Sequence, residues 1–481
     1  MTVNGGQDYE GLLEENRRLK EENAALRERI VVLEAKMKMD SSNSSLPPSS
    51  DRPGARAKRT KSKAERRSDQ SKKDKAKARS RGKQPGAEGS HLAMKENPDE
   101  SKVLDADPCL CGADLSDSKV LSVEVRQVFD LPEPKVTVRE YRVIKRRCSC
   151  GARLEGTFPK EARAPTCYGP NVRAYALYLL NGQFLSYERC AEALSEMMGV
   201  NVSEGFISSV VGEAGEALVG FTQEINRRLI ESKVVHFDET SDQVGTKKCW
   251  FHTATNGHLV SLYASPTRGK AATLEHGIFK AHKGVSVHDR FSQYFSLKRN
   301  LHQVCTAHLM RDLEGISIYQ GEQWAEDMKE LLSKMIVSAS EARDAGKSRV
   351  SKKVMSDLLS RYDELVEQGI SQNAAPVGYK KPVGYKNECL NLAKALKKHK
   401  ISVTRFLKDL TVPPTNNEAE RSLRMVKLHS KISGCFQSMD HARHFARVRS
   451  YIQTARYHDV GALSVLRMLF QNNAWMPPAI C

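Results

Sequence analysis

The 481-residue sequence predicts a multidomain α+β fold, in which an α/β core carries a helical insertion and follows an N-terminal coiled coil and a cysteine module. Three patterns support this class. Residues 12–37 repeat an apolar residue with zipper spacing, two C-x-C pairs flank alternating apolar residues at 109–150, and two short apolar runs end in Asp before a long helical interval. The expected parts are residues 1–39, 40–90, 91–165, 166–232, 233–320, 321–408 and 409–481.

Length, cysteine count and charge narrow the class of protein. A chain of this length with 40% hydrophobic residues can bury two or three cores without disulfides. It has eleven cysteines, an odd number, no apolar signal segment, and no run near the roughly 18 apolar residues of a membrane span. We therefore expect a cytoplasmic protein without a membrane partner. The formal charge of +18 predicts a polyanionic partner, although charge alone separates nucleic acid from a membrane surface poorly.

Residues 1–39 are predicted to form a coiled-coil dimerisation zipper. The two heptad positions are occupied by Leu12, Leu19, Leu26 and Leu33 and by Asn16, Asn23, Ile30 and Met37. Paired asparagines at one position favour a parallel, in-register homodimer, because each buried amide is best satisfied by its twin. The alternative is an amphipathic helix docked on its own domain. A homodimer or a higher homo-oligomer follows from the zipper.

Residues 40–90 are predicted to be a basic disordered linker, because Ser, Pro, Lys, Arg and Gly bury too little apolar surface to offset chain entropy. Between positions 52 and 83 there are 15 Lys or Arg against three acidic residues, a net charge of +12. A solvated tail is the ordinary interpretation of such a run, but an arm that follows DNA phosphates is favoured here. The candidate contacts are Arg56, Lys58, Arg59, Lys61, Arg66 and Arg67.

Residues 91–165 are predicted to form a zinc-ribbon-like DNA-binding module. Cys109 and Cys111 precede strand-like alternation around 123–129 and 136–144, and Cys148 and Cys150 follow it. Four thiolates satisfy a tetrahedral Zn²⁺ and can hold together a module too small for a core. The C-x-C spacing is tighter than the usual C-x-x-C, and four unrelated free thiols are the alternative.

Residues 166–232 are predicted to be helical. A helix break at Gly199 and a capping residue at Ser203 have helix-turn-helix proportions. A plain helical hairpin that packs on the next domain is at least as well supported, because the second helix offers no evident base-reading row of Arg or Asn.

Residues 233–320 are predicted to begin the core. A short buried strand from Lys233 ends in Asp238, a hairpin turns about Asn256-Gly257, and a second strand from Gly284 ends in Asp289. This order suits an RNase H-like sheet, with both carboxylates at neighbouring strand ends. Each Asp taken alone would more often be a cap or turn residue. Residues 321–408 are rich in Lys and Glu with helical spacing, which predicts a helical insertion.

Residues 411–424, TVPPTNNEAERSLR, predict a helix start. Thr415 or Asn416 can cap it, and Glu418 stands in capping-box spacing from Thr415. Glu420 is expected to lie past the first turn of this helix, where a carboxylate gains little from the helix dipole, so it must face solvent or a site. An isolated Glu would more often be exposed and paired with the arginine four residues later.

Several motifs resemble those of the insertion-sequence-66 family of transposases. They are Asn416-Asn417-Glu418-Ala419-Glu420-Arg421, Lys431-Ile-Ser-Gly434 and Phe445-Ala446-Arg447, with Ser450 and Thr454 beyond. The Asp238-Glu-Thr word and Asp289 resemble the family's other acidic motifs, and Cys305-Thr-Ala-His308 with Arg311 resembles its C-x-A-H helix. Thr415 stands where the family usually has Asp, and Arg290 where it commonly has Gly. The resemblance runs from Ser41 to about Phe470.

The resemblance implies a DDE transposase with Asp238, Asp289 and Glu420 as its catalytic triad. Three carboxylates suit two Mg²⁺ or Mn²⁺ ions at a phosphodiester, with the element ends and target DNA as substrates. Companion proteins of the element are possible partners. Cys305 and His308 could be half of a zinc site, but packing and hydrogen bonding are favoured for them. Past Glu420, arginines on helical segments are expected to meet phosphates: Arg421, Arg424, Arg443, Arg447, Arg449 and Arg456.

The rival function is a catalytically inactive, dimeric DNA-binding regulator derived from a transposase. It would keep the zipper, the cysteine module and the fold. Convergence of the three carboxylates distinguishes the two, because two bridged metals need all three within about 8 Å of one another.

Overall fold

The computed structural model describes residues 13–20, 22–23, 92–105, 110–111, 116, 119–296, 300–374 and 387–479. Its internal contacts divide the chain into two units, residues 1–56 with 137–481 and residues 57–136. Within the predicted zipper, residues 13–20 and 22–23 are helical. The rest of the zipper and the whole linker 40–90 lie outside the described residues, so dimerisation and the arm stay predictions.

The strand-like alternation between the cysteine pairs does not form strands. Residues 123–129 and 136–144 have no regular secondary structure, and the apolar side chains of Val123, Val125 and Val128 are exposed. Alternation gives a strand only where a neighbouring strand takes up the backbone hydrogen bonds. The next strands along the chain are β1 (Lys145–Arg147) and β2 (Arg153–Glu155), which pair antiparallel around Cys148 and Cys150.

A layer of helices precedes the sheet. It comprises α3 (Pro170–Leu177), a π-helical turn η2 (Tyr178–Gly182), α4 (Tyr187–Met198), α5 (Glu204–Ala217) and α6 (Val219–Glu231). The helix α4 ends at Gly199, which has a positive φ, and the Ser203 side chain caps α5 by accepting from Phe206 N–H. Ile207, Val210, Val211 and Ala214 of α5 are buried in the core that this layer shares with later helices. Both the helical hairpin and the helix-turn-helix bury one face of the second helix, so this choice stays a prediction.

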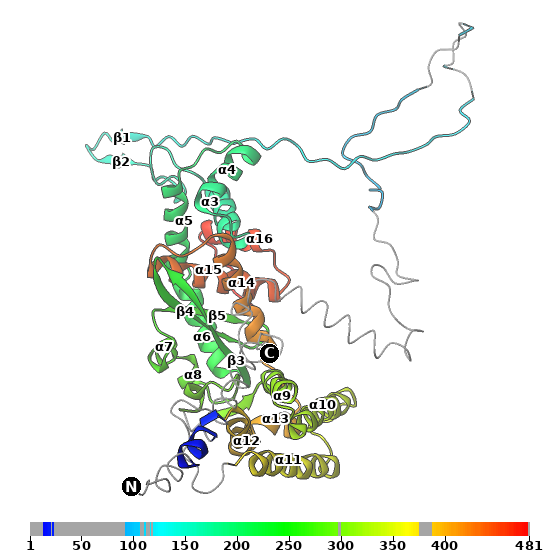
Figure 1. Ribbon diagram of the computed structural model, residues 1–481. Helices are drawn as coiled ribbons and strands as arrows, with labels where there is room; N and C mark the ends of the chain where they lie inside the picture. Colours follow the sequence, from blue (N-terminus) through cyan, green and yellow to red (C-terminus); the bar gives the residue numbers. More distant parts are fainter. Residues whose placement is uncertain are drawn as a thin grey trace, which may run out of the picture. The chain divides into compact units, whose positions relative to one another are not determined.

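The core of the molecule is a five-stranded mixed sheet of order β5-β4-β3-β6-β7 (Figure 1). The strands are β3 (Val234–Val244), β4 (Lys247–Thr255), β5 (Val260–Ser265), β6 (Val285–His288) and β7 (Leu301–Val304). The first three pair antiparallel, whereas β6 runs parallel to β3 and β7 parallel to β6. Asn256 and Gly257 form the β4–β5 turn, as predicted, with Gly257 at φ +86°. Short helices α7 (Lys270–His276), α8 (Ile278–Ala281) and η3 (Ser292–Ser296) connect the later strands.

The first strand is longer than the sequence predicted, so Asp238 lies in its middle and not at its end. The strand β3 continues to Val244 because β4 pairs with it along that whole length. Its parallel partner β6 pairs only as far as His236, opposite Val287. Asp238 therefore lies just beyond the end of the parallel ladder, on the open side of β3.

The helical insertion has its own hydrophobic core. The helix α9 (Thr306–Gln320) leads from β7 into α10 (Gln323–Asp344), α11 (Lys352–Gln372), α12 (Glu388–Lys398) and α13 (Lys400–Lys408), which form one bundle in Figure 1. Trp324, Met328, Tyr362 and Phe406 are buried at the centre of this bundle together with Leu313 of α9. The first turn of α9 is thus held between the sheet and the insertion.

Three C-terminal helices complete the structure: α14 (Asn417–Ile432), α15 (Met439–Tyr457) and α16 (Ala462–Phe470). The helix α14 packs on β3 and α15 packs on β5. Ser450 accepts a hydrogen bond from Leu262 N–H and Thr454 one from Val260 N–H, so two hydroxyls of α15 cover the outer edge of β5. No helix among the described residues combines the length and the apolar character needed to cross a bilayer.

Candidate active site

Asp238 and Asp289 lie side by side where the parallel part of the sheet opens. The last paired residues are His236 and Val287, and each Asp follows its own by two positions. Both side chains are half-buried. The Asp289 carboxylate accepts from Phe291 N–H at 2.9 Å, which fixes the turn after β6 without the glycine that the family commonly has there. Arg290 instead forms an ion pair with Asp312 at 3.2 Å.

Glu420 reaches this place from the first turn of α14, and not from beyond that turn as predicted. Asn416 holds that helix start in position. Asn416 is fully buried; its side chain donates to the Phe237 carbonyl at 2.8 Å and lies 3.1 Å from His236 Nδ1. Its own N–H donates to Cys305 Sγ at 3.1 Å. These bonds join α14 to both β3 and the start of α9.

The predicted capping box is wrong. Asn416 is the N-cap residue of α14, but no side chain caps the helix there, because the Asn416 amide is used by the sheet. Glu418 does not reach back toward Thr415; it pairs with Arg421 at 3.3 Å. The tertiary bonds of a buried amide outweigh a local cap, since leaving its polar groups unpaired in the core costs more.

Burial and neighbouring acids raise the pKa of each of the three carboxylates. Burial, then the charges of Glu239 and Asp289, and further that of Glu420, raise the pKa of Asp238 well above its usual range. Burial and the Glu239 charge raise the pKa of Asp289 to about 6. Burial also raises the pKa of Glu420, to which Asp289 adds while Arg311 and Arg424 oppose it. Such a group of acids gains from a bound cation and is costly without one.

Glu239 is a fourth acid beside the site, but its oxygens are already occupied. Its side chain is 1% exposed and pairs with Arg268 at 2.8 Å. The Tyr294 hydroxyl donates to its other oxygen, and the Arg268 guanidinium lies 4.0 Å from the centre of the Phe291 ring. Glu239 is therefore held beside Asp238 and Asp289 by its contacts with Arg268 and Tyr294. Sequence reasoning missed this role; an acid directly after Asp238 in a buried strand was the available signal.

Cys305, His308 and Arg311 surround Glu420 from the first turns of α9. His308 Nδ1 lies 3.5 Å from Glu420 Oε1, and an Arg311 nitrogen lies 3.7 Å from the same oxygen. Burial, with the charges of Arg311 and Arg290, lowers the pKa of His308 to about 3, so its imidazole is neutral. Burial raises the pKa of the Cys305 thiol to about 11. No motif in the sequence predicts a third group beside Cys305 and His308, and the fold supplies Glu420.

The basic residues predicted to contact DNA separate into different environments. Arg421 is exposed beside Glu418, Arg424 is exposed, and Arg443 pairs with Asp440 near the surface. Arg447 donates to the Gly215 carbonyl and to Glu216 of α5, so its charge is partly used within the protein.

Arg449 does not face phosphates as predicted. It is 1% exposed, donates to the Asn181 carbonyl at 3.2 Å and lies 5.3 Å from the centre of the Phe184 ring. Helical periodicity turns it inward from Arg447, toward the helices that precede the sheet. The predicted contacts from Arg56 to Arg67 lie outside the described residues.

The cysteine module is described only in part. Cys148 and Cys150 are exposed at the turn between β1 and β2, where Cys148 N–H donates to the Ala152 carbonyl and Gly151 N–H to the Cys148 carbonyl. Hydrogen bonds from Cys150 are the main cause that lowers the pKa of the Cys148 thiol. Cys111 is also exposed and Cys109 lies outside the described residues, so the predicted four-thiolate site stays a prediction.

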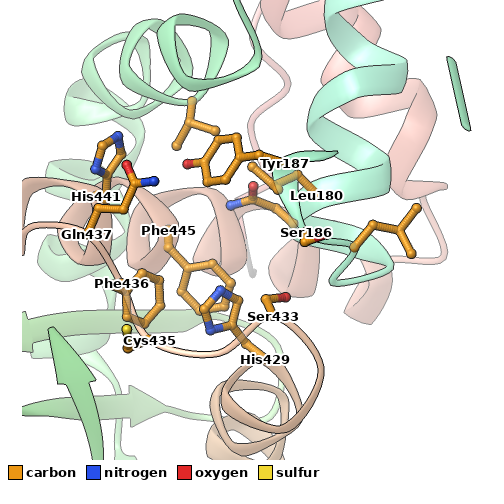
Figure 2. A pocket seen from close by; sticks show the side chains of 13 residues that line it. Leu180, Ser186, Tyr187, His429, Ser433, Cys435, Phe436, Gln437, His441 and Phe445 are labelled. Carbon is orange, nitrogen blue, oxygen red and sulfur yellow. The ribbon is translucent and has the colours of Figure 1, made fainter. Parts of the chain in front are cut away.

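A pocket of about 130 Å³ lies apart from the carboxylates, between η2, α4 and the C-terminal helices (Figure 2). His429 stacks on Phe436 with ring centres 4.3 Å apart, and Tyr187 and Cys435 also line it. Burial lowers the pKa of His429 to about 4, so the pocket offers a neutral imidazole. None of Asp238, Asp289 and Glu420 lines this pocket.

Two family models match parts of the chain. Residues 165–444 match the model of the Transposase IS66 family, and residues 7–93 match a family of unknown function (DUF6444). No curated protein matches the chain. The first match covers more than half of the 481 residues and contains all three carboxylates. The chain therefore belongs to the IS66 family of transposases.

Proposed function

We propose that this transposase is an active DDE enzyme, which cuts DNA at the ends of its element and transfers the freed strand to target DNA. Membership of the family supports the class of function. The sheet supports an RNase H-like core, because an antiparallel meander, β5-β4-β3, is continued by two parallel strands, and the acids lie at the junction. The helical insertion enters between the second Asp and Glu420.

The proposal is supported by the strand register, which puts Asp238 and Asp289 on adjacent strands, and by the effect of Asp289 and Glu420 on the pKa of Asp238. The donor set of the three carboxylates fits divalent cations, since carboxylate oxygens are the ligands that Mg²⁺ and Mn²⁺ prefer. Glu420 Oε1 is also buried without a hydrogen-bond partner in the described structure, and burial is the main cause that raises the pKa of Asp238 and of Glu420. Bound there, two such ions would activate the attacking oxygen and stabilise the leaving oxygen of a phosphodiester.

Other residues of the chain hold the three carboxylates in position. The β3 and β6 backbones fix Asp238 and Asp289, and Asn416 fixes the helix that carries Glu420. The Glu239–Arg268–Tyr294 contacts keep the neighbouring acid out of the site. Arg311 places a positive charge 3.7 Å from Glu420, where it can also meet a DNA phosphate.

The test is incubation of the protein with Mg²⁺ and the DNA that flanks its own gene. We expect Mg²⁺-dependent nicking at the element ends and its loss in Asp238→Asn, with DNA binding retained in a gel-shift titration. The rival regulator would bind the same DNA and leave it uncut under every metal tested. The convergence of the acids favours the enzyme, because a regulator has no need to keep repelling carboxylates together.

DNA contacts, zinc and dimerisation complete the proposal. We infer that the exposed Arg421 and Arg424, which lie on the helix of Glu420, contact phosphates beside the site. We further propose a structural Zn²⁺ on Cys109, Cys111, Cys148 and Cys150, supported by the hairpin turn that exposes the second pair. Dimerisation through residues 1–39 rests on the heptad pattern alone.

A further inference from the structure

We propose that Cys305, His308 and Glu420 form a separate site for a thiophilic divalent cation of the Zn²⁺ class, and that its occupancy withdraws Glu420 from Asp238 and Asp289 and so inhibits DNA cleavage. The inhibitory part rests on the proposed function, whereas the binding part does not. Among the described residues, these three are the one group of His, Cys, Asp or Glu whose ligand atoms all lie within 4.8 Å of one another.

The spacing of the ligand atoms suits a tetrahedral ion. An ion held about 2.1 Å from both a nitrogen and an oxygen in tetrahedral geometry keeps those two atoms about 3.4 Å apart. His308 Nδ1 and Glu420 Oε1 are already 3.5 Å apart. The sulfur needs a somewhat longer bond, of about 2.3 Å, and a small rotation of the Cys305 side chain supplies the remaining closure.

Two buried polar atoms of this group lack the partners that a cation would provide. His308 Nδ1 and Glu420 Oε1 are buried and have no hydrogen-bond partner within the described part of the chain. Buried polar atoms are nearly always paired, so two unpaired atoms that face each other indicate a missing ligand. A cation between them satisfies both at once.

The surrounding backbone offsets part of the cost of burying a thiolate at Cys305. Cys305 is the N-cap residue of α9 and Asn416 the N-cap residue of α14, so two helix N-termini meet here, and Asn416 N–H donates to Cys305 Sγ at 3.1 Å. Helix N-termini and backbone N–H donors both stabilise a thiolate that ligates metal. Thr306 N–H donates to the Pro414 carbonyl at 2.9 Å, which locks the two helix starts together.

Ligand softness separates this site from the carboxylate site. Thiolate and imidazole select Zn²⁺ and similar ions, whereas Mg²⁺ prefers oxygen. Three protein ligands leave a fourth position open, as in labile zinc sites rather than closed structural ones. Arg311, 3.7 Å from Glu420 Oε1, opposes a cation there and must turn aside when the site fills. Because Glu420 belongs to both sites, occupancy of one reduces occupancy of the other.

The binding test is a titration of the metal-free full chain with Co²⁺, a spectroscopic substitute for Zn²⁺ that reports thiolate ligation by its charge-transfer absorption. We compare wild type with Cys305→Ser, His308→Gln and the control Cys389→Ser, a cysteine equally buried in the insertion. Wild type and the control should bind one more Co²⁺ per chain than the other two variants. Equal stoichiometry in all four overturns the site, and thermal unfolding of each variant excludes loss of fold as the cause of a difference.

The inhibition test adds Zn²⁺ to Mg²⁺-dependent cleavage of end-bearing DNA, with each rate expressed relative to the same variant's zinc-free rate. The Zn²⁺ concentration for half inhibition should rise about tenfold or more in Cys305→Ser, since even the loss of an outer-shell contact costs about 10-fold to 100-fold in affinity. Equal inhibition of wild type and Cys305→Ser would overturn the inhibitory role. If wild type never cleaves, the proposed function fails, while the Co²⁺ titration still decides the site.

Discussion

Replacing Asp289 with Asn should stabilise the metal-free protein at neutral pH, although it removes a proposed catalytic ligand. Burial and Glu239 raise the pKa of Asp289 to about 6, from a reference value of 3.8. A folded pKa above the unfolded one means that stability is fully present below about pH 4 and is lost as the pH rises through about 6. A shift of about 2 units at about 1.36 kcal/mol each sets an upper limit of about 3 kcal/mol.

Asparagine carries no charge, and its side-chain oxygen can still accept from Phe291 N–H. We therefore expect Asp289→Asn to raise the free energy of unfolding by about 1–3 kcal/mol at pH 8 and by little at pH 4. Denaturant unfolding with a chelator present, at both pH values, measures this. Asp440→Asn is the control, because that side chain is exposed and should change stability by less than about 0.5 kcal/mol. A gain equal at both pH values, or a loss at pH 8, would refute the electrostatic reasoning.

Further variants test the roles assigned to individual residues and to the N-terminal segment. Glu420→Gln should abolish Mg²⁺-dependent nicking but keep the gel shift. Glu418→Gln loses only a surface pair with Arg421 and should keep most activity. The reverse pattern would show that Glu418 is the third carboxylate. Asn416→Ala should lower the free energy of unfolding by about 2–3 kcal/mol, because it leaves the Phe237 carbonyl and His236 unpaired in the core. Denaturant unfolding measures this change, and an unchanged free energy would contradict the role of this amide. Deleting residues 1–39 should convert the free protein to a monomer by light scattering, and an unchanged mass would place the interface elsewhere. Cys148→Ser should lower bound zinc in elemental analysis, unless the thiols are unrelated.

The sequence allowed prediction of those parts of the fold that local patterns determine. The hairpin about Asn256-Gly257 follows from turn chemistry between two apolar runs, and the strand leading to Asp289 follows from an unbroken buried run. The strand containing Asp238 is longer than the short strand predicted, because β4 pairs with it to Val244. Pairing with a neighbouring strand overrides the local signal.

The missed interactions all join residues far apart in sequence. Asn416 bonds to residues 180 and 111 positions away, so its motif gave only a local capping interpretation. The same holds for Cys305 and His308, whose third partner arrives on α14. Spacing within a motif can suggest a ligand pair, but only the fold brings a distant acid to complete it.

The site combines groups that repel one another with bonds that prevent their separation. Asp289 and Glu420 both raise the pKa of Asp238, and Asp289 also raises that of Glu420, so their closeness costs stability in the absence of cations. Asn416 and Thr306 offset this cost by fixing the start of α14 to β3 and α9 through buried hydrogen bonds. Glu420 is the acid on which both proposed metal sites depend, and it is also the one carried by a helix rather than a strand. A small rotation of its side chain between the two sites therefore needs no change in the sheet, which leaves Asp238 and Asp289 in place whichever cation is bound.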